Sequence, residues 1–166
     1  MTNLGIREAR RAFLAKCGMA AVAAVICDFS VLTPRADAAN WNLPDAEWRR
    51  RLSPQAYAVL RQASTERAYS SPLLKEHRKG QFACGGCALP LYASNTKFES
   101  GTGWPSFWDH LPGAVNLRRD GSLGMVRTEV RCSRCLGHLG HLFDDGPRPT
   151  GKRYCMNGAA LTFKPA

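Results

Sequence analysis

The chain has 166 residues, which is enough for a short leader and one domain. Its hydrophobic content of 45% is ordinary for a soluble globular protein, and no stretch is long and apolar enough for a membrane span. The formal net charge is +10, but a positive balance usually reflects a solvated face and does not by itself indicate nucleic-acid binding.

The N-terminal segment has the pattern of an export leader. An arginine pair at 10–11, followed by Phe-Leu and a lysine, resembles a twin-arginine signal. The alanine-rich run 17–27 is too short to span a bilayer but suits the apolar part of a signal, and small residues at 36–38 suit a cleavage box. We therefore expect cleavage after residue 38 and a periplasmic domain over 39–166. The alternatives are a disordered basic tail or an uncleaved anchor.

Helix-start signals mark the first part of the expected domain. The stretch 41–64 has helical character, and Pro44 precedes acidic residues that suit a first helical turn. The serine-proline pairs at 53–54 and 71–72 each place an N-cap before a proline at the first helical position. The second pair predicts a short helix through residue 77, with Gly80 as its stop.

Beyond residue 80 the pattern changes to short β-prone runs between glycines and prolines. The run 125–131 alternates in part, as a half-buried antiparallel strand does. We therefore predict a mainly β protein, with a helical N-terminal arm packed on an antiparallel β core. The expected strands are Gln81–Cys84, Leu89–Ala93, Val115–Leu117, Leu123–Cys132, His138–Phe143, Arg153–Met156 and Leu161–Lys164.

Two Cys-x-x-Cys pairs, Cys84 with Cys87 and Cys132 with Cys135, predict one closed tetrahedral zinc site. Such a site would join two hairpins that are distant in sequence. Metal binding of this kind supplies on the order of 10 kcal/mol of apparent folding free energy. One alternative is a disulfide within each pair, formed in an oxidising compartment. Another uses the two downstream histidines as ligands together with the second cysteine pair.

Cys155 is the cysteine that remains once the leader and the paired cysteines are set aside. Arg153 lies two residues away, so on a strand it would share a face with Cys155 and favour the reactive thiolate. Asn157 continues that face. A lone thiol beside a cation indicates a nucleophile, and the alternative is a buried structural cysteine.

Three further features suit a site around such a nucleophile. His138 and His141 could donate a proton to a leaving oxygen, and Gly140 permits a bulge that turns both rings toward one site. Asp145 is a candidate to orient one ring or to hold a water. Trp104, between glycine and proline, offers an apolar wall for a methyl-sulfur group. Taken singly, each of these residues could equally have a structural role.

These motifs together resemble one known family. Two Cys-x-x-Cys pairs, Gly-Trp-Pro-Ser-Phe at 103–107, His-Leu-Gly-His-Leu-Phe at 138–143 and Arg-Tyr-Cys-x-Asn at 153–157 are similar to methionine sulfoxide reductase B. The resemblance covers residues 45–164. It implies two antiparallel β-sheets with N-terminal helices (a β-tent), a structural zinc ion, and repair of oxidised proteins by reduction of the R epimer of methionine sulfoxide.

The resemblance also implies a role for each site residue. Cys155 attacks the sulfoxide sulfur and becomes a sulfenic acid, while His141 and His138 supply a proton to the sulfoxide oxygen. Trp104 holds the methyl group. The implied catalytic set is Cys155, His141, His138, Asn157 and Arg153, and the implied substrate-binding residues are Trp104 and Asp145.

The sequence departs from the family pattern at two positions. Thr102 stands where many relatives carry a recycling cysteine, so we expect an external thiol, such as a thioredoxin-like donor, to reduce the sulfenic acid. Gly158 replaces a serine that is frequent in relatives. We expect a monomer that binds no nucleic acid and does not insert in a membrane after cleavage.

Two rival interpretations use the same residues. A zinc-dependent nucleic-acid module would use the cysteine pairs and the positive charge, but it predicts exposed aromatics among basic side chains, and these are sparse here. A thiol peroxidase would use Cys155 on hydroperoxides.

Overall fold

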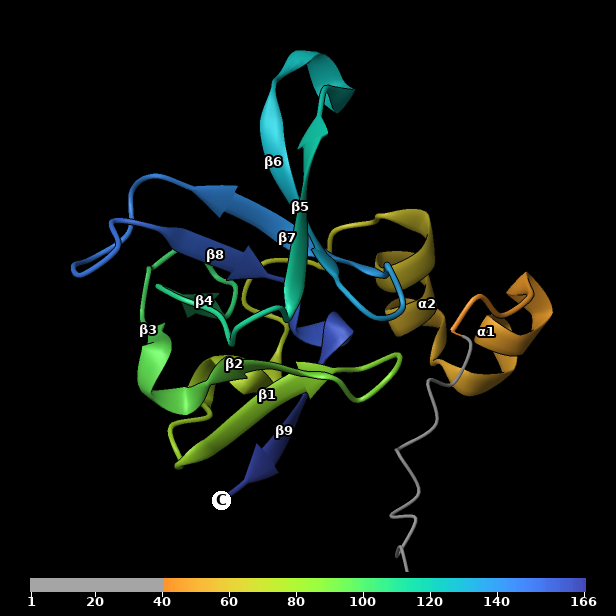
Figure 1. Cartoon of the computed structure of the whole chain (residues 1–166), viewed down its shortest axis with the longest axis horizontal. Coiled ribbons are helices and arrows are strands. Elements are labelled where there is room, and N and C mark those ends of the chain that lie inside the picture. The colour runs from red at the N-terminus through yellow and green to blue at the C-terminus, as the bar shows by residue number, and fades with distance from the viewer. Residues whose placement is uncertain (1–40) are drawn as a thin grey trace, which may run out of the picture. The chain divides into compact units, whose positions relative to one another are not determined.

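A computed structural model describes residues 41–166, so the predicted leader lies outside the described residues. In this range the strands form two antiparallel sheets, one of three strands and one of six (Figure 1). The prediction of a mainly β protein with N-terminal helices is therefore confirmed. No helix in the described range is long and apolar enough to cross a membrane.

Two short helices begin where the sequence signals predict. Helix α1 (Asp45–Arg51) follows Pro44, and helix α2 (Pro54–Gln62) is capped by the Ser53 hydroxyl, which accepts a hydrogen bond from the backbone N–H of Ala56. The third predicted helix is shorter than expected. Only one 3₁₀ turn, η1 (Pro72–Lys75), forms there, and Gly80 begins a strand instead of ending a helix.

The smaller sheet has the order β2-β1-β9. It contains β1 (Gly80–Cys84), β2 (Pro90–Ala93) and β9 (Leu161–Pro165), all three of them predicted to within one residue at each end. The 3₁₀ turn η4 (Gly158–Ala160) connects the larger sheet to β9. The last strand of the chain therefore pairs with the first strand of the β core, which closes the domain.

The larger sheet has the order β3-β4-β8-β7-β6-β5. Strands β7 and β8 have the predicted bounds, whereas β5 is longer than predicted and β6 begins four residues later, after the 3₁₀ turn η3 (Ser122–Gly124). The two-residue strands β3 and β4 were not predicted, because two residues cannot show an alternating pattern. The six strands are β3 (Lys97–Phe98), β4 (Ser106–Phe107), β5 (Val115–Asp120), β6 (Arg127–Cys132), β7 (His138–Phe143) and β8 (Arg153–Met156).

An aromatic core joins the two sheets. Tyr92 of β2 stacks on Phe107 of β4 at 4.3 Å between ring centroids, and Phe82 of β1 meets Phe107 edge-on at 5.0 Å. All three side chains are fully buried. Helix α2 packs against β7 and η4.

One row of directly paired residues crosses the larger sheet. Ser106 of β4 pairs with Cys155 of β8, which pairs with His141 of β7; His141 pairs with Glu129 of β6, which pairs with Arg118 of β5. Because directly opposite residues of antiparallel strands point to the same face, this row places the thiol, the imidazole and the two charged groups on one surface.

The predicted bulge in β7 is present. Val130 pairs with Gly140 but Arg131 pairs with His138, so β7 carries one extra residue, Leu139, opposite β6. The bulge resets the alternation and turns His138 to the same face as His141. The two rings lie edge to face with 5.3 Å between centroids.

Candidate active site and metal centre

The four paired cysteines meet where β1 and β6 end. Their sulfur atoms all lie within 4.8 Å of one another, and the sulfurs of Cys84 and Cys135 are 3.6 Å apart, those of Cys87 and Cys132 3.5 Å. A tetrahedral metal with bonds of about 2.3 Å to sulfur would set its ligands about 3.8 Å apart. The donor set therefore fits one tetrahedral ion, and the alternative that used the histidines as ligands is wrong.

The two cysteine pairs sit on matched turns. The backbone N–H of Ala88 donates to the backbone carbonyl oxygen of Cys84 at 2.8 Å. In the same way, the N–H of Leu136 donates to the carbonyl oxygen of Cys132 at 3.0 Å. Ala88 and Leu136 both adopt left-handed backbone angles, with φ of 58° and 57°. Every cysteine in the described range is a free thiol, so neither pair is closed by a disulfide.

Cys155 lies apart from this cluster, half-buried at the wall of a cavity of about 150 Å³. Gly140 belongs to the same wall, and a Cβ there would lie 2.1 Å from the carbonyl oxygen of Cys155, so only glycine fits. Four of the residues predicted for the site line this cavity: Cys155, His141, Trp104 and Asn157. The other three, His138, Arg153 and Asp145, do not line it. The lining residues are Thr65, Trp104, Arg127, Gly140, His141, Phe143, Cys155 and Asn157.

Hydroxyl groups lie on the other side of the thiol. The Thr102 hydroxyl is 3.9 Å from the Cys155 sulfur, and the Ser100 hydroxyl is 2.8 Å from those of both Thr102 and Ser106. Burial raises the pKa of the Cys155 thiol, while Thr102, Arg153 and Ser106 act in the opposite direction. Arg153 thus favours the thiolate as predicted, but desolvation outweighs it.

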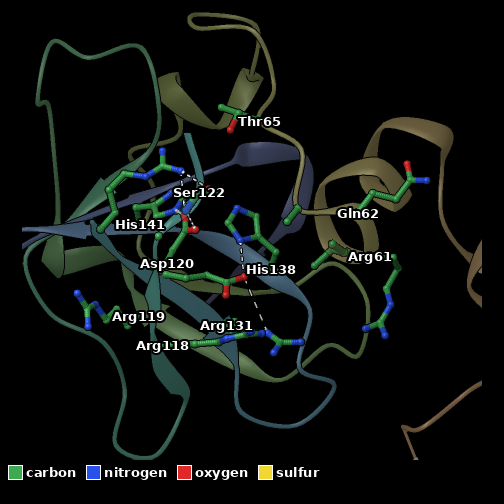
Figure 2. A pocket seen from close by; sticks show the side chains of 15 residues that line it. Arg61, Gln62, Thr65, Arg118, Arg119, Asp120, Ser122, Arg131, His138 and His141 are labelled. Atoms are coloured by element: carbon green, nitrogen blue, oxygen red, sulfur yellow. Dashed lines mark hydrogen bonds and ion pairs between the residues drawn. The ribbon is translucent and has the colours of Figure 1, made fainter. Parts of the chain in front are cut away.

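A second, larger cavity of about 590 Å³ adjoins the first, and Figure 2 shows the polar side chains that line it. It runs from the end of α2 to the β5–β6 hairpin. Thr65, Arg127 and His141 line both cavities, so the two lie side by side at these residues. His138, which does not reach the smaller cavity, lines the larger one.

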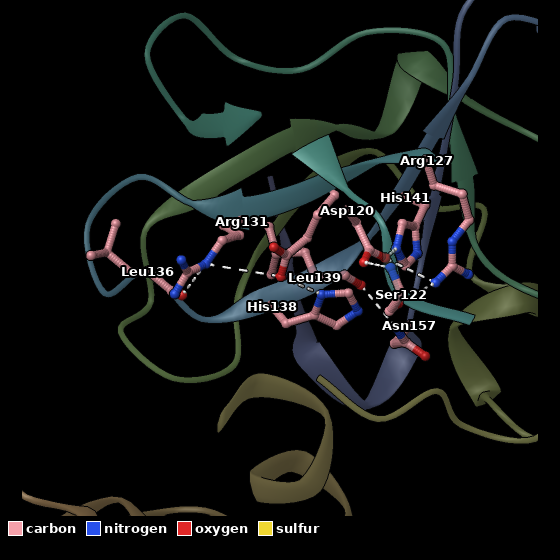
Figure 3. A network of polar contacts seen from close by, with 10 residues as sticks. Asp120, Ser122, Arg127, Arg131, Leu136, His138, Leu139, His141 and Asn157 are labelled. Carbon is pink, nitrogen blue, oxygen red and sulfur yellow. Dashed lines mark hydrogen bonds and ion pairs between the residues drawn. The ribbon is translucent and has the colours of Figure 1, made fainter. Parts of the chain in front are cut away.

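Each histidine is held by its own carboxylate (Figure 3). His138 Nδ1 lies 2.9 Å from Glu129 Oε1, and His141 Nε2 lies 2.8 Å from Asp120 Oδ2. Arg127 also donates to Asp120 Oδ2 at 2.9 Å. Hydrogen bonds from Ser122, followed by that from His141, hold the pKa of Asp120 well below its usual range. The Asp120 carboxylate is thus ionised, and it orients the His141 ring.

The two histidines differ in burial. Burial lowers the pKa of His138, with Glu129 opposing the effect, and its Nε2 is buried without a hydrogen-bond partner among the described residues. His141 instead lines the cavity that contains the Cys155 thiol. His141 is therefore the ring placed to reach a group bound beside that thiol.

Asp145, a candidate to orient a histidine ring or to hold a water, orients neither histidine. Asp145 instead accepts two hydrogen bonds from Arg153, both of 2.8 Å, and the guanidinium of Arg153 lies 4.3 Å from the ring centroid of Phe143. Arg153 is buried whereas the Asp145 side chain is 62% exposed. Because Phe143 lines the smaller cavity, Asp145 and Arg153 support one wall of it from behind.

Glu66 connects three parts of the site through three different groups. Its carboxylate accepts hydrogen bonds from the backbone N–H groups of Gly158 and Ala159, at 2.5 and 2.8 Å. Its own N–H donates to the Asn157 side chain at 2.9 Å, and its carbonyl accepts from the Trp104 indole at 3.2 Å. One buried residue thus fixes two walls of the cavity and the chain that follows Cys155.

Comparison with known proteins places the chain in a family. Residues 52–165 match the SelR domain. The chain belongs to the MsrB family of peptide methionine sulfoxide reductases. It is 50% identical over 125 residues to "Peptide methionine sulfoxide reductase MsrB" of Agrobacterium fabrum, a match that covers 75% of this chain and 93% of the relative. Proteins of the same name from Thiobacillus denitrificans and Leifsonia xyli are 53% and 55% identical, each over 73% of this chain and 92% and 88% of theirs.

A solved structure, the "Yippee-like" domain of Mis18, gives a TM-score of 0.45 at 18% identity over 54% of this chain and 98% of that one. This likeness is too weak to bear on fold or function. The resemblance to methionine sulfoxide reductase B drawn from the sequence motifs is confirmed by the family match.

The MsrB motifs did not reveal the carboxylates of the site. Asp120 and Glu129 lie outside them, on the β5–β6 hairpin. The alternation of Arg127, Glu129 and Arg131 along one face of β6 was a usable signal, because a strand with three charged residues on one face must point them to water or to partners. Asp120, just before a Gly-Ser turn, gave no such signal.

The departure from the MsrB pattern at Gly158 has a local compensation. A Cβ at Gly158 would lie 1.8 Å from the Ser71 hydroxyl, so the Ser71 side chain occupies the space that a larger residue would need. Ser71 is buried, and its hydroxyl caps the 3₁₀ turn η1 by accepting from Leu73. The glycine therefore suits this particular neighbour.

Proposed function

We propose that this chain reduces the R epimer of methionine sulfoxide, in peptides and proteins, to methionine. One observation carries the proposal: a cavity of about 150 Å³ is lined by the Cys155 thiol, the His141 ring and the Trp104 indole, in a chain that belongs to the MsrB family. A space of this size suits one methyl-sulfoxide group. The Trp104 face supplies the apolar surface that a methyl-sulfur group prefers.

The chemistry follows from the arrangement of these groups. The Cys155 thiolate attacks the sulfoxide sulfur, the oxygen passes to Cys155 with a proton, and methionine leaves. Two electrons thus move from the Cys155 sulfur to the substrate sulfur, and Cys155 becomes a sulfenic acid. Because a sulfoxide oxygen is a poor leaving group until it is protonated, the step needs an acid beside the thiol.

His141 is the group placed to be that acid. A neutral ring that donates its Nε2–H to Asp120 leaves Nδ1 as an acceptor, whereas the imidazolium can donate from both nitrogens. Asp120 contacts Nε2 of His141 at 2.8 Å, so a proton for the substrate would come from Nδ1. His138 supports His141 through the edge-to-face ring contact, and Asn157 and Trp104 position the substrate.

A structural zinc ion would be held by Cys84, Cys87, Cys132 and Cys135. Four thiolates at these separations are the donor set that zinc prefers in closed sites, and the ion would neutralise charges that otherwise repel each other. Bound there, it would link the end of β1 to the end of β6 and so join the two sheets.

An external thiol would complete the cycle. In the described range the other four cysteines form the metal cluster, and Thr102 lies beside Cys155 where a recycling cysteine would be needed. A thioredoxin-like donor would form a mixed disulfide with Cys155 and release water. A second thiol of the donor would then free Cys155. We further propose that the chain acts as a monomer in the periplasm, after twin-arginine export and removal of residues 1–38.

The test uses resolved epimers of a peptide methionine sulfoxide with dithiothreitol as reductant. The wild type should reduce the R epimer, and Cys155→Ser should show only the uncatalysed background. Turnover by the serine variant would contradict the assignment of the nucleophile. Mass spectrometry after substrate without reductant should find a sulfenic acid at Cys155, and a disulfide to a cluster cysteine would rule out the external donor.

A further inference from the structure

The larger cavity, of about 590 Å³, carries a positive charge that the reaction at Cys155 does not explain. Two carboxylates, Asp120 and Glu129, also face this cavity, but the arginines outnumber them. We call it the arginine groove, because five arginines line it: Arg61, Arg118, Arg119, Arg127 and Arg131. Figure 2 shows Arg118 and Arg119 on one side of the groove and Arg61 on the other.

The two carboxylates of the groove are already engaged. Asp120 receives hydrogen bonds from His141 and Arg127, and Glu129 contacts His138 at 2.9 Å and lies 4.0 Å from Arg131. Neither is free to neutralise the remaining cations. The acidic groups therefore hold the histidines in place and leave the groove positive.

Two arginines of the groove keep their charge uncompensated, and a third is compensated only in part. Arg61 donates to the backbone carbonyl of Cys135 at 3.0 Å, a neutral acceptor, and it interacts electrostatically with Asp45 of α1 without forming an ion pair. Arg118 and Arg119 are exposed, and neither forms an ion pair with any side chain of residues 41–166. Placing several such cations around one concave surface raises the local potential, because like charges there add instead of cancelling. The groove is built to attract an anion.

The position of the groove relative to the Cys155 thiol indicates which kind of anion the groove would bind. Cys155, His141, Glu129 and Arg118 lie in one row across β8, β7, β6 and β5. Three steps between neighbouring strands span about 14 Å. An extended peptide covers that distance in about four residues. A peptide whose oxidised methionine occupies the smaller cavity would thus carry residues three or four positions away over Arg118 and Arg119.

We propose that the arginine groove binds an acidic segment of the oxidised protein, with Asp or Glu three or four residues from the methionine sulfoxide. This inference rests on the proposed function and adds a preference among its substrates. The shared lining of the two cavities favours the substrate over the reductant as occupant, because a substrate chain that leaves the smaller cavity past His141 or Arg127 lies next to the groove.

The experiment compares peptides that contain one R-methionine sulfoxide and either two Glu or two Lys at the third and fourth positions, first on one side and then on the other. Dithiothreitol is the reductant, so no protein donor needs to dock. Each kcat/KM is divided by that for N-acetylmethionine sulfoxide, which is too short to reach Arg118. Two exposed ion pairs should favour the acidic peptide by about threefold to tenfold on one side.

The variant Arg118→Glu/Arg119→Glu should abolish or reverse this preference. The matched control, Lys75→Glu/Lys79→Glu, changes the net charge equally at exposed residues that do not line the groove, and it should keep the preference. The wild-type preference should also shrink between 0.05 and 0.5 M salt, values chosen because the screening length falls below about 5 Å at the upper end.

Three results would overturn the proposal: equal rates for acidic and basic peptides in the wild type, an unchanged preference in the Arg118/Arg119 variant, or loss of the preference in the lysine control. If the arginine variant lost activity only with a thioredoxin-like donor, the groove would bind the reductant and the proposal would also be wrong. Failure of the proposed function gives a different result, because no sulfoxide, including N-acetylmethionine sulfoxide, would then be reduced.

Discussion

Cys135 and Cys155 have opposite surroundings within one domain. Cys135 is buried and faces three other sulfurs, the nearest 3.6 Å away, in a pocket closed by two matched turns. Cys155 is half-buried and faces a hydroxyl, an imidazole and an indole around an open cavity. Four thiols that face one another can share a cation, whereas a thiol that faces a cavity can reach a substrate. The neighbours, and not the residue type, divide these cysteines into a structural set and a reactive one.

The comparison predicts that the two sites fail in different ways. Loss of the metal should remove a link between the sheets and so affect folding. Changes around Cys155 should affect turnover while the fold remains. The predictions below test this separation from the largest expected effect to the smallest.

Removal of the metal should have the largest effect. Stripping it with a chelator should destabilise the domain on the order of 10 kcal/mol, since a closed four-thiolate site contributes its binding energy to folding. Metal analysis, near-ultraviolet circular dichroism and the melting temperature measure this. The Cys155→Ser variant is the control, and it should keep one metal ion per chain and melt close to the wild type. A metal-free chain that melts within a few degrees of the native protein would contradict the structural role.

Replacing the two carboxylates that hold the histidines should lower kcat to different extents. Asp120→Asn should lower kcat about 100-fold, because positioned proton donors contribute about 10²–10⁴-fold and Asp120 holds the ring that reaches the Cys155 cavity. Glu129→Gln should cost less than about tenfold, because His138 does not line that cavity.

Steady-state kinetics with a peptide that contains R-methionine sulfoxide, with dithiothreitol as reductant, measure kcat for both variants. Equal losses of kcat in Asp120→Asn and Glu129→Gln would assign the same role to the two histidines.

How far the sequence predicts this site depends on which contacts are local. The metal cluster could be predicted because two residues between cysteines fix each half of it. Strands β7 and β8 could be predicted because their residues and flanking turns are distinctive. The Gly140 bulge was also predictable, since two histidines three residues apart reach one face of a strand only if the alternation is reset.

The contacts that could not be predicted depend on pairing between strands. The partner of His141 is Asp120, 21 residues away, and it is set by the register of β5 on β6 and of β6 on β7. No local pattern encodes that register. Asp145 was a candidate to orient a histidine ring or to hold a water, but the β7–β8 turn carries it to Arg153.

Glu66→Gln should have a smaller effect than Asp120→Asn, and on substrate affinity more than on turnover. The change weakens two charge-assisted hydrogen bonds to Gly158 and Ala159, which should cost about 1–3 kcal/mol of unfolding free energy. Because Glu66 also binds the Trp104 indole and Asn157, KM for the peptide sulfoxide should rise more than kcat falls.

The control for this positioning role is Glu47→Gln, which removes the charge from two partly exposed ion pairs on α1, with Arg50 and Arg51. It should change the free energy of unfolding by less than about 1 kcal/mol and leave KM unaltered. Reduced stability of Glu66→Gln with an unchanged KM would mean that the residue supports the fold alone.

The smallest effect concerns the hydroxyl beside the reactive sulfur. Thr102→Val keeps the shape of the side chain and removes the hydrogen bond to Cys155, whose pKa burial already raises. The pKa should therefore rise further, and the thiolate fraction at neutral pH should fall about fivefold, the equivalent of one net hydrogen bond. The rate of alkylation by iodoacetamide, followed against pH, measures this. Since the thiolate forms as pH rises, the variant's curve should lie on the alkaline side of the wild type.

Thr102→Ser keeps the donor and serves as the matched control, so its curve should coincide with that of the wild type. Coincident curves for Thr102→Val and the wild type would show that the 3.9 Å contact between the Thr102 hydroxyl and the Cys155 sulfur does not stabilise the thiolate. The contrast with the metal cluster makes this small effect informative. In the metal cluster each thiolate would be stabilised by a bound metal cation. At Cys155 burial raises the pKa of the thiol, and two hydroxyls and one guanidinium oppose that rise. Removing one of those three groups therefore measures how much of the reactivity of Cys155 comes from its immediate neighbours.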